Sequence, residues 1–187
     1  MSDQPHVAGA GLKLPAVKML ALDVDGVLTD ASIVIGPDGR ESKRFNAADG
    51  VGLRTWTRLG LVCAVITGRR GPAISHRLAD LGVQHVVQGS KDKGRDLEAL
   101  CAATGIAPAD VAYMGDDWPD LPILRRVGVP MAPANADARV KAVCRLVTAR
   151  AGGHGAVREA VEVLLAAMGR LEEGVKLWDG SRDAMGS

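Results

Sequence analysis

The chain has 187 residues, 47% of them apolar and 24% charged, which is the composition of a soluble globular domain with a substantial core. Its net charge of +1 gives no electrostatic reason to expect nucleic acid or a membrane as partner, and no apolar run is long enough for a membrane span or a signal-peptide core. Three cysteines, far apart and odd in number, favour free thiols in a reducing compartment, so we expect a cytoplasmic protein.

The first predicted elements are a strand, a hairpin and a helix. Residues 1–16 are rich in Gly, Ala and Pro and are expected to form a flexible N-terminal arm. An apolar strand is predicted over residues 17–24. A β-hairpin follows, with strands over 32–35 and 41–45 around a Pro-Asp-Gly turn. The spacing of the next apolar residues predicts a helix over residues 51–60.

Beyond this helix, strands and helices alternate. The predicted strands are 61–66, 85–88, 111–114, 128–131 and 145–147. The predicted helices are 72–81, 93–104, 119–126, 136–143 and 155–168. Such alternation is typical of a doubly wound α/β fold with a mostly parallel sheet, in which the strand-to-helix loops meet at one edge of the sheet. One domain is therefore expected over residues 17–168, followed by a polar, irregular C-terminal tail over 169–187.

Two acidic residues follow the first predicted strand. Asp23 and Asp25 come directly after an apolar run, and Gly26 allows the chain to turn sharply there. Two carboxylates at the end of a buried strand are costly unless a cation or a reaction uses them. The alternative is an acidic turn that is simply exposed to solvent.

Polar residues also follow three later strands. The hydroxyl of Thr67 and the backbone N–H groups near it could hold phosphate oxygens, although helix capping explains Thr67 taken alone. Lys93 opens a helix and could neutralise a phosphate, although an isolated lysine is usually just solvated. A second acidic cluster follows the strand 111–114, and an N-cap explains only one of its three carboxylates: Asp116, Asp117 and Asp120. Oxygen ligands from two strand ends suit Mg²⁺.

The order and strand-end placement of these residues resemble the four motifs of the haloacid dehalogenase superfamily of phosphotransferases. The motifs are matched by Asp23-x-Asp25, Thr67, Lys93 and Gly115-Asp116-Asp117-x-x-Asp120. The resemblance covers residues 18–165 and implies a Rossmann-like haloacid dehalogenase fold. It also implies that Asp23 is the nucleophile, forming an aspartyl-phosphate, and that Asp25 is the general acid and base.

The same resemblance implies roles for the other motif residues. Mg²⁺ would be held by Asp23, the backbone carbonyl of Asp25, and Asp116. Thr67 and Lys93 would bind the non-bridging phosphate oxygens. Asp117 and Asp120 would orient Asp116 or Lys93.

The intervals between the motifs leave no room for a separate cap domain. A hairpin, a helix and a strand fill the chain between Asp23 and Thr67, and a helix and a strand fill it between Thr67 and Lys93. We therefore expect a protruding hairpin, no cap, and a site that stays open or is closed by another subunit.

Longer segments resemble one family of this superfamily, the 3-deoxy-D-manno-octulosonate 8-phosphate phosphatases. The segments are 45–52 with Arg54, 66–69 with Arg77, 112–117 and 151–159. The family implies a capless homotetramer in which a neighbour's hairpin, and in some members the C-terminal tail, helps to close the site. It also implies a small phosphorylated sugar acid as substrate and a step towards bacterial lipopolysaccharide.

By this resemblance the substrate is contacted by ten residues from four segments. They are Asp25, Asn46, Ala47, Ala48, Asp49, Gly50, Arg54, Arg69, Arg77 and Lys93. Several arginines suit a substrate with both a carboxylate and a phosphate. Without the family, Arg77 reads equally well as an exposed helix residue and Arg69 as a loop-bracing ion pair. Ala48 departs from the family pattern, because many relatives have arginine there, and His154 stands where many have another basic residue.

Two alternatives remain open at this stage. One is a phosphatase of nine-carbon sialic-type acid 9-phosphates, which shares the scaffold and differs by a few pocket contacts. The other is a non-catalytic oligomerisation module, which the presence of both Asp23 and Asp25 disfavours.

Overall fold

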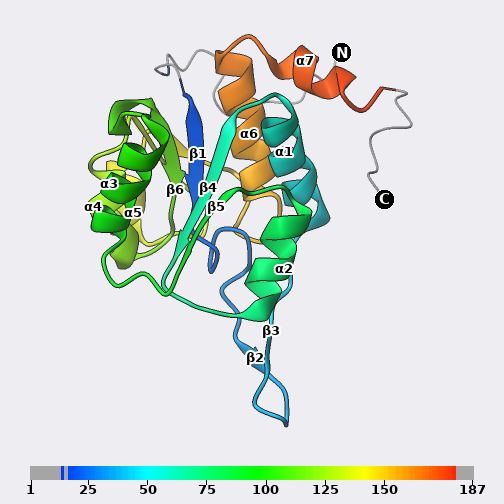
Figure 1. Ribbon diagram of the computed structural model, residues 1–187, viewed down its shortest axis with the longest axis vertical. Helices are drawn as coiled ribbons and strands as arrows, with labels where there is room; N and C mark the ends of the chain where they lie inside the picture. The colour runs from blue at the N-terminus through cyan, green and yellow to red at the C-terminus, as the bar shows by residue number, and fades with distance from the viewer. Residues whose placement is uncertain (1–13, 15–16, 180–187) are drawn as a thin grey trace.

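The computed structural model describes Leu14 and residues 17–179. Its centre is a six-stranded parallel sheet in the order β5-β4-β1-β6-β7-β8, seen nearly edge-on in Figure 1. The strands are β1 (Met19–Leu22), β4 (Val62–Thr67), β5 (His85–Gln88), β6 (Val111–Met114), β7 (Val129–Ala132) and β8 (Leu146–Val147). The predicted doubly wound α/β fold is confirmed. Apart from Leu14, the predicted N-terminal arm lies outside the described residues.

Helices cover both faces of this sheet. On one face lie α1 (Ala47–Arg58), α2 (Pro72–Asp80) and α6 (Ala156–Ala167), and on the other α3 (Lys93–Thr104), α4 (Leu121–Leu124) and α5 (Ala138–Val143). Side chains of a strand point alternately to opposite faces, so Leu20 and Leu22 of β1 join the first core and Met19 and Ala21 the second. All four are fully buried, which explains the uninterrupted apolar run that predicted this strand.

A short hairpin projects from the end of the sheet at which β1 finishes (Figure 1). Its strands, β2 (Val34–Ile35) and β3 (Glu41–Ser42), pair only with each other and are shorter than the predicted strands over 32–35 and 41–45. The predicted turn is present: Asp38 Oδ1 accepts a hydrogen bond from the Arg40 N–H. Its apolar residues Ile33, Val34 and Ile35 are 54–66% exposed, so the hairpin contributes little to the core.

Several helices begin or end away from the predicted positions. Helix α1 begins at Ala47 rather than near residue 51, because the side chain of Asn46 caps it by accepting a hydrogen bond from the Ala48 N–H. The predicted helix 119–126 is a 3₁₀-helix (Trp118–Asp120) followed by α4, since Pro119 and Pro122 each lack an N–H group to donate. Helix α2 begins at Pro72 as predicted, and α3 matches its predicted range.

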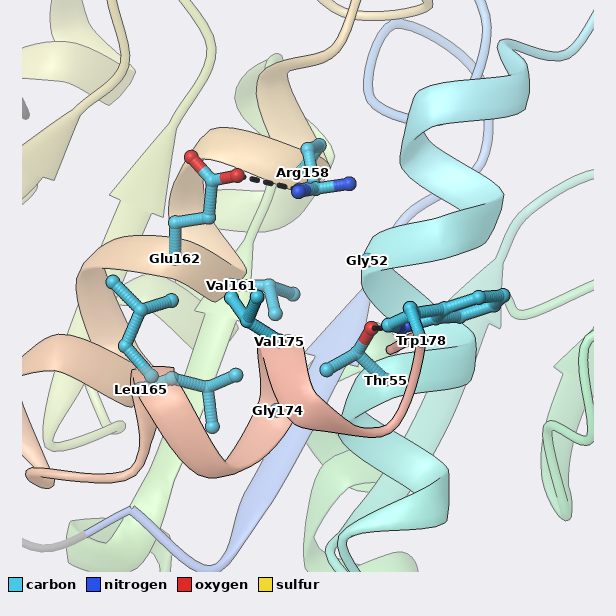
Figure 2. Close-up of a pocket in the computed structure, with 10 residues that line it drawn as sticks. Gly52, Thr55, Arg158, Val161, Glu162, Leu165, Gly174, Val175 and Trp178 are labelled. Carbon is cyan, nitrogen blue, oxygen red and sulfur yellow. Dashed lines mark hydrogen bonds and ion pairs between the residues drawn. The ribbon is translucent and has the colours of Figure 1, made fainter. Parts of the chain in front are cut away.

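The sequence suggested an irregular tail after α6, but its described part, up to residue 179, contains a helix. A helix, α7 (Leu171–Lys176), packs across α1 and α6, and Trp178 follows it (Figures 1 and 2). The indole N–H of Trp178 donates to Thr55 Oγ1 at 2.9 Å, and the Arg58 guanidinium lies 5.2 Å from the ring. A methyl group on Gly174 would come within 2.8 Å of Thr55 Cγ2, so glycine permits this close packing. The chain up to residue 179 is therefore part of the folded unit.

Within the described residues, no helix is long and apolar enough to span a membrane.

Candidate active site

The predicted catalytic residues meet at the carboxyl ends of three neighbouring strands. Strand β1 lies between β4 and β6, so the loops after these strands and the first turn of α3 surround one pocket of about 310 Å³. Its polar lining is Asp23, Asp25, Thr67, Arg69, Lys93, Asp116, Asp117 and Asp120. Residues separated by up to 97 positions in the chain are thus brought together, from Asp23 to Asp120.

Asp23 lies at the centre of the pocket and is almost fully buried. Its Oδ1 accepts a hydrogen bond from the Val24 N–H at 2.7 Å, and its Oδ2 accepts one from Lys93 Nζ at 2.6 Å. Burial and the charge of Asp120 raise the pKa of Asp23 from 3.8 to about 6, although Lys93 opposes the shift. These contacts hold the carboxylate in one orientation, as a nucleophile requires.

Asp120 supports its neighbours rather than facing the pocket with a free oxygen. Its Oδ1 accepts hydrogen bonds from Lys93 Nζ at 2.7 Å and from the Tyr113 hydroxyl at 2.6 Å. Its Oδ2 accepts from the backbone N–H groups of Asp116 and Asp117. Both oxygens are therefore occupied by donors that fix Lys93 and the loop after β6.

Tyr113 was not foreseen as part of this network. It is fully buried, and burial together with the charge of Asp120 raises the pKa of its hydroxyl well above the ordinary value, so it remains a donor. Asp117 is exposed, and its carboxylate accepts from the Trp118 N–H as the N-cap of the 3₁₀-helix.

The carboxylates of the pocket are suited to a divalent cation. Oxygens of Asp23, Asp116 and Asp120 all lie within 4.8 Å of one another. Burial and the charges of Asp120, Asp23 and Asp117 raise the pKa of Asp116 from 3.8 to about 7, which shows how strongly these anions repel one another. Each oxygen of Asp120 has two donors, whereas each oxygen of Asp23 has one, so Asp23 and Asp116 are the better ligands. A side chain on Gly26 would overlap the Asp116 carboxylate, so glycine makes room for it.

The two oxygens of Asp25 have different surroundings. Oδ1 accepts a hydrogen bond from Lys43 Nζ at 2.5 Å, whereas Oδ2 is buried and has no hydrogen-bond partner among the described residues. Arg69 Nε lies 3.8 Å from Oδ2, and Arg69 Nη1 donates to Glu41 at 2.8 Å. Neither Lys43 nor Glu41 was foreseen, because both lie in the polar hairpin.

Thr67 is buried at the end of β4, with its hydroxyl in the pocket lining. Its Oγ1 accepts a hydrogen bond from the Arg69 N–H at 3.3 Å, and its backbone carbonyl accepts one from the Ser90 N–H. Thr67 thus braces its own loop as well as facing the site.

The residues expected to contact substrate fall into three groups. Arg69 and Lys93 lie in the catalytic pocket with Asp25. A second pocket of about 250 Å³ is lined by four of the others together with Trp178: Ala47, Gly50, Arg54 and Arg77. In this second pocket, Arg54 and Arg77 both form ion pairs with Asp80.

The third group supports the loop before α6. Asp49 is buried, and its carboxylate accepts hydrogen bonds from the Gly155 and Arg158 N–H groups. Asn46 Nδ2 donates to the Gly153 carbonyl, and the Ala48 N–H donates to Asn46 Oδ1. The side chains of Asn46 and Asp49 thus tie α1 to the chain that precedes α6.

Comparison with known proteins agrees with the geometry of the site. Residues 80–160 match the family model of the haloacid dehalogenase-like hydrolases. The chain is 42% identical over 169 residues to the 3-deoxy-D-manno-octulosonate 8-phosphate phosphatase KdsC of Escherichia coli (strain K12), covering 90% of each protein.

Two crystal structures have similar folds. One is the 3-deoxy-D-manno-octulosonate 8-phosphate phosphatase from Moraxella catarrhalis in complex with magnesium ion, phosphate ion and KDO. It has a TM-score of 0.85 and 36% identity, covering 87% of this chain and 94% of that one. The other is a probable YrbI family phosphatase from Pseudomonas syringae pv. phaseolica 1448a, with a TM-score of 0.86 and 41% identity, covering 89% of this chain and 95% of that one.

Proposed function

Because the chain belongs to the family of 3-deoxy-D-manno-octulosonate 8-phosphate phosphatases, we propose that it hydrolyses this sugar acid phosphate to 3-deoxy-D-manno-octulosonate and phosphate. The enzyme is a phosphoric monoester hydrolase of the haloacid dehalogenase type, with Mg²⁺ as its cofactor. The observation that carries the proposal is the placement of Asp23, oriented by Lys93 at 2.6 Å, in one pocket with Asp25, Thr67 and Asp116. Its product is a precursor in lipopolysaccharide synthesis.

The reaction proceeds in two steps on the side chains of this pocket. Asp23 attacks the phosphorus, and the bond from phosphorus to the sugar oxygen breaks. Asp25 gives a proton to that leaving oxygen and later takes one from the water that hydrolyses the aspartyl-phosphate. Thr67 and Lys93 bind the non-bridging oxygens, on which charge is redistributed in the transition state.

Asp23, the backbone carbonyl of Asp25, and Asp116 would hold the Mg²⁺ ion. The bound ion supplies positive charge that offsets the repulsion between an anionic nucleophile and a dianionic phosphate. Asp120 keeps the Asp116 loop and Lys93 in place through its hydrogen bonds to both.

Substrate selectivity is assigned to the arginines of both pockets. Arg69 lies beside Asp25, whereas Arg54 and Arg77 line the second pocket with Ala47 and Gly50. We propose that the second pocket meets the catalytic pocket of a neighbouring subunit in a homotetramer, with the exposed apolar residues of the hairpin at the subunit contact. The three free cysteines support a cytoplasmic location for this assembly.

The proposed activity is tested by measuring phosphate release from a panel of sugar acid phosphates, with Mg²⁺ and with a chelator. We expect the eight-carbon acid 8-phosphate to be among the best substrates and the chelator to abolish turnover. A clear preference for a nine-carbon acid 9-phosphate would contradict the proposed substrate but would still agree with the proposed phosphatase reaction.

The nucleophile is tested separately with Asp23→Asn. This variant is expected to lose more than about 1,000-fold in kcat, because removal of a nucleophile leaves only binding and electrostatic effects. Its circular dichroism spectrum and its oligomeric state should match the wild type, since the amide is isosteric with the carboxylate. Retained turnover would contradict the assignment of Asp23.

A further inference from the structure

A lysine of the hairpin reaches the catalytic Asp25. Lys43 follows β3, and its side chain is only 4% exposed. Its Nζ lies 2.5 Å from Asp25 Oδ1 and 2.8 Å from Glu41 Oε1. Burial opposes the charge of this ammonium group, but the two carboxylates outweigh burial and raise the pKa of Lys43. A charged, buried lysine with two partners fixes the groups that it touches.

The contact with Lys43 leaves Asp25 with one bound oxygen and one free oxygen. Oδ1 is held by Lys43, with the Thr29 hydroxyl at 3.4 Å, while Oδ2 has no hydrogen-bond partner in the described part of the chain. Asp25 also lines the catalytic pocket. Buried oxygens without a partner are uncommon in folded proteins and call for an explanation, such as a reacting group that they serve.

We infer that Lys43 is the positioning residue of Asp25: it binds Oδ1 and so holds the carboxyl group in the orientation in which it exchanges a proton with the reacting oxygen. This inference rests on the proposed function, in which Asp25 is the general acid and base. In the first step the proton of the Asp25 carboxyl group passes to the sugar oxygen as the bond from that oxygen to phosphorus breaks. In the second step the Asp25 carboxylate takes a proton from the attacking water. Lys43 keeps its own protons throughout.

The surrounding charges keep Lys43 in place. Glu41 lies on β3, two residues before Lys43, with Oε1 paired to Lys43 and Oε2 accepting a hydrogen bond from Arg69 Nη1 at 2.8 Å. Arg69 belongs to the loop after β4 and also faces Asp25. The four side chains therefore link three segments of the chain: the loop after β1, the hairpin and the loop after β4.

A second role for Lys43 predicts a different result. If its ammonium bound the substrate phosphate directly, its loss would weaken binding of every phosphate ester to a similar extent. If it acts through Asp25, its loss affects only those steps in which a proton is transferred. The leaving group separates these roles, because a sugar alkoxide needs a proton to depart and p-nitrophenolate does not.

The test is Lys43→Met, measured as kcat/KM in the presence of Mg²⁺ for 3-deoxy-D-manno-octulosonate 8-phosphate and for p-nitrophenyl phosphate. We expect kcat/KM for the sugar acid phosphate to fall about 10- to 100-fold, as part of the contribution of general acid catalysis. The value for p-nitrophenyl phosphate should fall less than about threefold. Lys43→Arg is expected to recover most of the loss, because a guanidinium can also donate to Oδ1.

Asp25→Asn provides the reference in the same assay. If Lys43 acts through Asp25, adding Lys43→Met to Asp25→Asn should change kcat/KM less than about twofold, since effects on one unit are not additive. Arg44→Met is the matched control: it removes the neighbouring hairpin cation, which pairs with Asp30, and should leave both substrates unaffected.

Three results would overturn the inference. They are equal losses of Lys43→Met on both substrates, a rise in KM alone, or additive losses in the double variant. These leave the proposed function intact, provided that Asp25→Asn discriminates between the substrates. Should Asp25→Asn fail to discriminate, the role of Asp25 and the inference about Lys43 would fall together.

Discussion

The carboxylates of the catalytic pocket differ in how many hydrogen-bond donors of the chain they accept from. Asp120 accepts hydrogen bonds at both oxygens, and Asp25 has Lys43 on one. Asp23 shares Lys93 with Asp120, whereas the pKa of Asp116 is held at about 7 by burial and neighbouring anions. The lone pairs of Asp120 are therefore fully used by donors of the chain, whereas Asp23 and Asp116, the proposed ligands, keep lone pairs for an ion.

This difference predicts how pH and Mg²⁺ act together on stability. The pKa values of Asp23 and Asp116 are raised from 3.8 to about 6 and about 7 in the folded chain. Between about pH 4 and pH 7 these two carboxyl groups therefore bind more protons in the metal-free folded protein than in the unfolded chain, so their contribution to stability falls as the pH rises. Because Mg²⁺ binds the ionised carboxylates, its addition is expected to raise Tm more at pH 8 than at pH 5.

Asp116→Asn is the control for this measurement. In chelator at pH 8 it should be more stable than the wild type, since it removes one of the repelling charges, and its Tm should respond little to Mg²⁺. An equal rise in Tm on adding Mg²⁺ at both pH values would contradict the prediction.

The sequence predicted the residues at strand ends and missed those that reach the site by packing. Asp23, Asp25 and Asp116 were found because acidic residues directly after apolar strands have no structural need to be there. Lys43 and Tyr113 have no such signal. Lys43 lies in a polar hairpin, and Tyr113 is one apolar position of a buried strand, so only tertiary contacts reveal their partners.

Among the elements, α7 shows how a polar segment becomes part of the fold. It packs over α1 with Gly174 against Thr55, and Trp178 then donates its indole N–H to the same threonine (Figure 2). The apolar residues of the segment are too few to give a clear helical period, so the sequence did not predict this helix.

The packing of α7 predicts that Gly174→Ala destabilises the wild-type protein but stabilises a variant in which Thr55 has lost its methyl group. Gly174→Ala places a methyl group 2.8 Å from Thr55 Cγ2. Overpacking costs about 1–3 kcal/mol, which helix propensity offsets by about 1 kcal/mol, so the single variant should be less stable. In a Thr55→Ser background, which keeps the hydroxyl and removes the methyl group, the same change should stabilise by up to about 1 kcal/mol. Urea unfolding of the four proteins measures both effects.

Two outcomes would contradict this account of α7. One is a stabilising effect of Gly174→Ala in the wild-type background. The other is an equally destabilising effect in both backgrounds, because the clash with Thr55 would then play no part.

Element positions were predicted better than element ends. The strands after Gly60 lie within one residue of their predicted ranges at every end, because buried parallel strands are continuous apolar runs. The ends that moved depend on local contacts. Asn46 caps α1 earlier than expected, and two prolines divide the predicted helix 119–126 into a 3₁₀-helix and α4.

At the scale of the whole molecule, the strand order explains why the residues of the catalytic pocket lie together at one edge of the sheet. Strand β1 has parallel neighbours on both sides, and each contributes a loop to the catalytic pocket. Strand alternation predicted this edge, since a parallel sheet allows few arrangements. It did not predict that Arg54 and Arg77 would line a second pocket, because a family resemblance names contact residues without saying which of them share a pocket within one chain.

The hairpin is the proposed contact between subunits, and this contact can be tested by replacing its exposed apolar residues. The triple variant Ile33→Thr, Val34→Thr, Ile35→Thr keeps β-forming residues at three exposed positions. We expect it to form smaller species than the wild type in size-exclusion chromatography with light scattering. Its kcat/KM for the sugar acid phosphate should fall as the arginines of the neighbour are lost.

Val86→Thr is the matched control, since Val86 is an exposed apolar residue on the edge strand β5. It should leave both assembly and activity unchanged. A triple variant that elutes and turns over like the wild type would contradict the proposed contact.

The central position of β1 in the sheet also determines how much of the chain must be synthesised before the catalytic pocket can form. Met19 lies opposite Val62 of β4 and Val111 of β6, so β1, which leads into the proposed nucleophile Asp23, emerges from the ribosome long before its neighbours. Pairings between distant parts of a chain form slowly, because the loop between them must close first. Because Asp116 lies beyond the middle of the 187 residues, Asp23 can come close to it only after more than half of the polypeptide has been made. A nascent chain that ends before β6 therefore contains Asp23 but cannot form the catalytic pocket.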